Sequence, residues 1–172
     1  MTGRALILLI ALLLSPPTGA AAAEKAREQV LLVHVTSLLD GGTDRTALVF
    51  RLAAAGLRQG RRVALCFDAE GVLSLKMGRW FGGHSTPIDR VKIPLEERRD
   101  LAGMLGTAPD GIPDIYGSLL HFLKGRGVAV TASEKALKLR GLWPERYDQV
   151  AEPVNEGRML ELLRAADTHV TY

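Results

Sequence analysis

The sequence contains few cysteine and aromatic residues. Cys66 is the only cysteine among 172 residues, so no intramolecular disulfide can form and the fold must rely on its core. Two tryptophans and three tyrosines are too few to indicate a surface on which sugars or bases stack. Neither a GxGxxG nor a GxxxxGK[ST] pattern is present, which argues against nucleotide binding.

Long apolar runs are absent except near the N-terminus. Residues 5–14 are ten consecutive apolar residues, preceded by one arginine and followed by a pair of prolines, and residues 21–23 are three alanines that fit a small-x-small cleavage site. The run is shorter than the ~20 residues that cross a bilayer. We expect residues 1–23 to be a signal peptide and residues 24–172 to be periplasmic or secreted, without a stable membrane span after cleavage. The alternative is an uncleaved anchor.

The charge of the remaining chain is nearly balanced. Removing Arg4 from 22 basic residues leaves 21 against 19 acidic residues, a net charge of about +2. This balance argues against a nucleic-acid-binding chain of the usual basic kind. The four histidines, His34, His84, His121 and His169, share no metal-ligand spacing, so we predict no metal and no cofactor.

Strand-like and helix-like segments alternate along the chain. Residues 30–36 and 61–68 are largely apolar, as in strands buried in a parallel sheet, and residues 44–60 between them have helical spacing of apolar residues. The pattern predicts one three-layer α/β domain with a mainly parallel sheet of about five strands and a flavodoxin-like plan. Further strands are expected at 128–131 and 168–172, and further helices at 115–123, 132–140 and 155–163.

Residues 74–112 interrupt this alternation. They are rich in glycine and proline, with one short helix expected over residues 95–105, and we interpret them as an elaborated insertion. Trp80 and Phe81 stand beside two glycines, followed by His84. These three residues are candidates for contact with a partner protein, and the alternative is that the two aromatics anchor the loop to the domain.

Several motifs, taken in order, resemble the DsrE/DsrF-like family. The resemblance covers nearly all of residues 28–172 and implies a DsrE-like fold, a link to sulfur relay, and assembly into homo- or hetero-oligomers with related subunits or a periplasmic partner. The motifs are T-x-x-x-D-G-G-T-D-R over 36–45, D-x-E-G-V over 68–72, a stretch over 119–142 that contains G-R-G-V-x-V-T-A-S-E-K-A, and N-E-G-x-x-x-E-L-L-R-A-A-D over 155–167.

One residue type that the resemblance implies is missing. Several members of the family act in sulfur relay and carry a persulfide on a cysteine just after the strand that here contains Val130, but this chain has Thr131, Ala132 and Ser133 there. Because the thiolate is the nucleophile that accepts sulfur, hydroxyl groups cannot replace it. Sulfur relay through this position is therefore not expected, and an enzymatic function is not favoured.

Three candidate sites remain, each with a structural alternative. Cys66 could be a relocated sulfur carrier, although its apolar neighbours favour a buried, inert thiol. The segment from Thr131 to Glu134 could bind a ligand at the end of a strand, or its first and last residues could form a capping box. A loop could hold an anion, or its aspartates could serve as turn and cap residues; it contains Asp40, Gly41, Gly42, Thr43 and Asp44.

Three functions follow from these observations. The first, which we favour, is an exported, non-catalytic oligomeric binding or scaffold module of the DsrE-like type. The second is a sulfur-relay protein with a persulfide on Cys66. The third is a small-anion sensor that uses the two strand-end loops.

Overall fold

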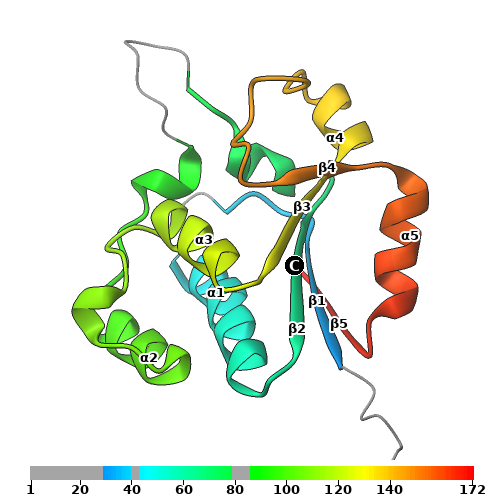
Figure 1. Ribbon diagram of the computed structural model, residues 1–172. Coiled ribbons are helices and arrows are strands. Elements are labelled where there is room, and N and C mark those ends of the chain that lie inside the picture. Colours follow the sequence, from blue (N-terminus) through cyan, green and yellow to red (C-terminus); the bar gives the residue numbers. More distant parts are fainter. Residues whose placement is uncertain (1–28, 40–42, 79–85) are drawn as a thin grey trace, which may run out of the picture.

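The computed structural model describes residues 29–39, 43–78 and 86–172, and its centre is a five-stranded sheet (Figure 1). Every neighbouring pair of strands is parallel, and the order across the sheet is β4-β3-β2-β1-β5. The chain therefore adds strands in one direction from β1 and then returns to place β5 on the other side of β1. The strands are β1 (Val30–Val35), β2 (Arg62–Phe67), β3 (Ala129–Ser133), β4 (Glu152–Val154) and β5 (Thr168–Thr171).

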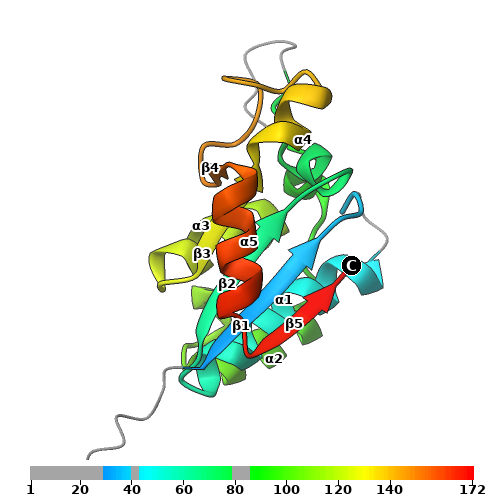
Figure 2. The same ribbon diagram turned by 90° about the vertical axis from the view of Figure 1, so that its right-hand side faces the viewer.

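Helices cover both faces of the sheet, so the predicted three-layer α/β architecture is confirmed. Helices α1 and α3 lie on one face with α2 packed beside α1, whereas α5 lies on the opposite face (Figures 1 and 2). No helix in the described part of the chain is long and apolar enough to cross a membrane. The helices are α1 (Thr43–Arg58), α2 (Leu95–Leu105), α3 (Tyr116–Gly125), α4 (Glu134–Leu139) and α5 (Glu156–Ala165).

The two faces of the sheet bury very different amounts of apolar surface. Alternate residues of β1, such as Leu31 and Val33, join the large core under α1 and α3. Leu32 belongs instead to a small cluster under α5 that also contains Cys66 and Met159. The single helix α5 covers only part of its face of the sheet, and Figure 2 shows β5 outside that cover.

The described part of the segment after β2 contains regular structure that packs on the domain. The helix predicted over residues 95–105 is present as α2, with those bounds, and short 3₁₀ turns stand on either side of it. Ile88, Ile93 and Leu101 are buried in the main core. The described part of residues 74–112 therefore contributes to the main core of the domain.

One strand, β4, lies in a part of the chain for which the sequence analysis predicts neither a strand nor a helix. β4 pairs with β3 through Glu152, Pro153 and Val154, although residues 142–153 carry no strand pattern. Proline is tolerated there because β4 is at the edge of the sheet, where one side of the strand needs no partner. The strand depends on tertiary contact with β3 and not on local preference.

Candidate functional site

Cys66 lies in the centre of the sheet, beneath α5. Its side chain is fully buried, and its Sγ atom is 3.1 Å from the Sδ atom of Met159 on α5. Burial raises the pKa of the Cys66 thiol from 9.0 to about 11, and the negative charge of Asp68 adds to this rise. A hydrogen bond with the hydroxyl of Thr131 opposes it. The thiol is therefore protonated at neutral pH, in keeping with its apolar sequence neighbours.

The junction between β3 and α4 differs from the predicted capping box. Ser133, not Thr131, is the N-cap of α4, and its Oγ atom accepts a hydrogen bond from the amide of Ala136 at 3.3 Å. The prediction was wrong because β3 continues through Ser133, two residues beyond the expected end of the strand at residue 131. Glu134 is then the first residue of the helix, and it forms an ion pair with Lys138.

The side chains at this junction are largely enclosed. Thr131 is buried in β3, with its hydroxyl 3.4 Å from the carbonyl oxygen of Leu65, and Ala132 is buried in the main core. Ser133 is also buried, and its hydroxyl is occupied by the cap. The position where the family resemblance implies a reactive thiol therefore presents no free nucleophile among these three residues.

The other predicted site residues are only partly within the described structure. Asp40, Gly41 and Gly42 lie outside the described residues, as do the partner-contact candidates Trp80, Phe81 and His84. Thr43 is the first residue of α1, and Asp44 is exposed in the first turn of that helix. A negative charge at this place is favourable because it faces the positive end of the helix dipole.

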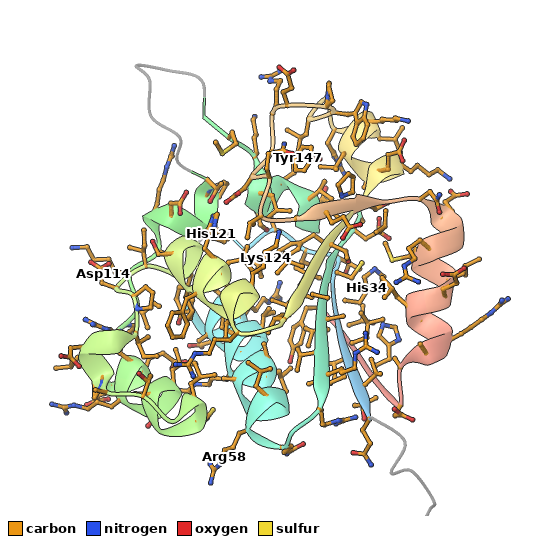
Figure 3. The ribbon with its side chains drawn as sticks, in the orientation of Figure 1. His34, Arg58, Asp114, His121, Lys124 and Tyr147 are labelled. Carbon is orange, nitrogen blue, oxygen red and sulfur yellow. The ribbon has the colours of Figure 1, made fainter. Side chains whose placement is uncertain are left out.

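Two histidines that are far apart in sequence meet on the α5 side of the sheet. His34 of β1 and His169 of β5 stack, with ring centroids 5.6 Å apart and planes inclined by 30°. The Nε2 atom of His34 is 3.4 Å from Asp68, and Nε2 of His169 is 3.2 Å from the hydroxyl of Thr171. Figure 3 labels His34 beside the sheet on the side of α5.

Sequence reasoning missed this pair. It placed both histidines in strands, which is correct, but they are 135 positions apart in the chain (169 − 34), and only the return of the chain to β1 makes them neighbours. The pair does not complete a metal site within one chain. In the described residues, no three His, Cys, Asp or Glu side chains gather closely enough to hold a metal ion.

A shallow cleft of about 500 Å³ lies at the opposite end of the sheet from α4, between the last turns of α1 and α2. Arg58 and Arg126 contribute its positive charge, and Leu57 and Met104 contribute its apolar surface. Arg126 donates a hydrogen bond to the carbonyl oxygen of Leu105 at 2.6 Å and stacks on a phenylalanine. Because it caps the carboxyl end of α2, Arg126 has a structural role here.

Comparison with known proteins gives a likeness of fold alone. No family model matches the sequence, and no curated protein is similar to it at a significant level. Among solved structures, the chain is similar to a crystal structure of the ychN protein from E. coli, with 16% sequence identity and a TM-score of 0.49. The likeness covers 84% of this chain and 99% of that chain.

Proposed function

We propose that the protein is an exported, non-catalytic binding or scaffold module of the DsrE-like type, which works as an oligomer in association with sulfur metabolism. The proposal that the module is non-catalytic rests on the burial of Cys66 and on the raised pKa of its thiol. This thiol is the only one in the chain, it is fully buried, and its pKa is raised to about 11. A sulfur carrier requires an accessible thiolate.

The junction after β3 supports the same proposal. A relay protein of this kind would present a thiol there, but Thr131 and Ser133 have hydroxyls that are buried and already in contact with backbone groups. A hydroxyl has a far higher pKa than a thiol and does not accept sulfane sulfur. What remains is a folded domain without a nucleophile at that place, as expected of a binding module.

The relay function through Cys66 is the alternative that an experiment must exclude. The reduced protein without residues 1–23 is treated with a sulfane-sulfur donor under native conditions, and its intact mass is measured beside that of Cys66→Ala. We expect no added sulfur in either protein, because Met159 and α5 cover the thiol. An added sulfur atom that disappears in Cys66→Ala would overturn the proposal and establish Cys66 as a carrier.

A further inference from the structure

The cleft between the last turns of α1 and α2 carries positive charge that no acidic side chain of its lining balances. Asp100 lies one turn before Gly103 on α2, but its carboxylate is paired with Arg51 at 3.3 Å. The cleft therefore attracts a negatively charged group. The described residues that line it include no aspartate or glutamate; they are Leu57, Arg58, Gly103, Met104, Leu105, Gly106 and Arg126.

The two arginines of the cleft are held differently. Arg126 is fixed in place, because it donates to the carbonyl oxygen of Leu105 at 2.6 Å and lies over the ring of Phe122, 4.8 Å from the centroid. Arg58 is exposed in the last turn of α1, forms no hydrogen bond or ion pair with another described residue, and projects from the end of that helix in Figure 3. A guanidinium has five N–H donors in a planar fork, so the free donors of both side chains suit a carboxylate.

Gly103 leaves open space inside the cleft. It lies within α2, where alanine would favour the helix by about 1 kcal/mol, and a Cβ added there would have no atom within 4 Å. The packing of the described residues therefore does not require a glycine at this position. Without a side chain, the backbone of α2 is open here to close approach by another chain.

The last turn of α2 also presents free hydrogen-bond acceptors. The last four carbonyl oxygens of a helix have no partner within it. That of Ala102 accepts from the amide of Thr107 at 3.0 Å, and that of Leu105 accepts from the guanidinium described above. The carbonyl oxygens of Gly103 and Met104 accept no hydrogen bond from the described residues. They suit the amide groups of a peptide and do not suit a bare anion.

The apolar part of the cleft gives it room for a side chain as well. Leu57 and Met104 are partly buried, and each packs on the main core while its remaining surface lines the cleft. The volume of about 500 Å³ lies within the range of about 300–1,000 Å³ that is usual for ligand sites. A shallow cleft does not enclose about 70–90% of a small ligand, as such sites do. A segment of a larger protein fits better, because the rest of that protein covers the open side.

We propose that this cleft binds an acidic segment of a partner protein. A carboxylate of the segment is held by Arg58 and Arg126, a neighbouring apolar side chain packs on Leu57 and Met104, and backbone amides donate to the free carbonyl oxygens of α2. This inference rests on the proposed function, since it names the class of partner that the binding module recognises.

The test is the fluorescence anisotropy of a labelled peptide of alternating aspartate and leucine, titrated with the tag-free protein without residues 1–23. We expect saturable binding with a Kd of about 100 µM or tighter, which weakens as salt is added. A peptide with lysine in place of aspartate should not bind. A peptide with serine in place of leucine should bind at least about tenfold more weakly, because it buries no apolar side chain.

Three variants of the protein locate the site. Arg58→Ala should weaken binding about fivefold or more, because it removes hydrogen bonds to a carboxylate. Its matched control is Arg164→Ala, which removes the same charge from an exposed arginine in the last turn of α5, outside the cleft, and should leave the affinity unchanged. Gly103→Leu places a side chain in the cleft where its Cβ meets no atom, so it should abolish binding while the protein still unfolds cooperatively in urea.

Three results would overturn this inference. They are no saturable binding of the acidic peptide, an equal loss in Arg58→Ala and Arg164→Ala, and unchanged binding in folded Gly103→Leu. If Gly103→Leu does not fold, the two arginine variants decide. Sodium octanoate is titrated in parallel, and binding that requires Arg58 for octanoate but not for the peptide would assign the cleft to a small amphiphile instead.

The outcome is independent of the sulfur-donor experiment. That experiment concerns only the thiol of Cys66, which does not line the cleft. A persulfide on Cys66 would refute the non-catalytic function even if the acidic peptide binds. Failure of the peptide to bind would refute the present inference even if Cys66 takes up no sulfur.

Discussion

Replacing Cys66 should change how the stability of the protein depends on pH. In the folded state the pKa of this thiol is about 11, against 9.0 for an exposed thiol. Below pH 9 the thiol is protonated in both the folded and the unfolded state, so the free energy of unfolding keeps its full value with respect to this group. Between pH 9 and 11 only the unfolded state releases the proton, and the free energy of unfolding falls by about 1.4 kcal/mol for each pH unit. The total loss is about 3 kcal/mol.

Cys66→Ala abolishes this pH-dependent loss of stability, but it lowers the free energy of unfolding in another way that does not depend on pH. Deleting a buried sulfur costs transfer free energy and leaves a small cavity beside Met159, which lowers the free energy of unfolding by about 1–2 kcal/mol at pH 8. The variant should therefore be less stable than the natural chain at pH 8 and more stable at pH 11, with the two curves crossing near pH 10. Tyr116, whose pKa burial raises to about 12, is present in both proteins and cancels in the difference.

The assay is urea unfolding followed by circular dichroism at intervals from pH 7 to 11, with both proteins at the same ionic strength. The quantity to compare is the difference in the free energy of unfolding between the two proteins at each pH. A difference that stays constant across this range would refute the reasoning. It would mean that the thiol of Cys66 titrates alike in the folded and unfolded states and is therefore not desolvated by the fold.

Two further predictions test packing and ion pairing in the domain away from Cys66. Gly71→Ala should lower the free energy of unfolding by at least about 2 kcal/mol, because the added Cβ would lie 2.0 Å from the carbonyl oxygen of Val35. The matched variant is Gly103→Ala, because a Cβ added at Gly103 would have no atom within 4 Å. In urea unfolding, its free energy of unfolding should rise by about 0.5–1 kcal/mol, since alanine favours a helix more than glycine does. Equal effects at the two glycines would contradict this account. Arg51→Ala should lower the free energy of unfolding by about 2 kcal/mol in the same assay, because it leaves the buried carboxylate of Glu97 unpaired. The expected loss is smaller than for a fully buried ion pair because Arg51 is 42% exposed and water screens its charge. Adding Glu97→Leu should restore part of the loss, and no recovery would show that the ion pair is not the cause.

Local sequence signals predict most of the elements. The apolar, β-branched runs indicate β1 and β2, and the polar Asn155 before an amphipathic stretch marks the start of α5. The same reasoning fails where tertiary contact decides. β4 has only three residues around a proline, and the N-cap of α4 depends on how far β3 continues as a strand.

In the candidate site too, some features follow from the local sequence and others depend on tertiary contacts. The burial of Cys66 follows from the apolar residues on both sides of it in the sequence. The contact between His34 and His169 does not, because it depends on the position of β5 next to β1 rather than next to β4. No spacing rule along the chain reports the order of strands in a parallel sheet.

The most direct test of the central claim is the rate at which Cys66 reacts with a maleimide at pH 8, measured from zero urea up to the unfolding transition. A pKa of about 11 alone reduces the thiolate to roughly one hundredth of its amount in a free cysteine, and burial adds to this protection. We predict negligible labelling of the native protein and a rate that rises with the unfolded fraction. Labelling in zero urea at the rate of a free cysteine would contradict the account and return Cys66 to the role of a sulfur carrier.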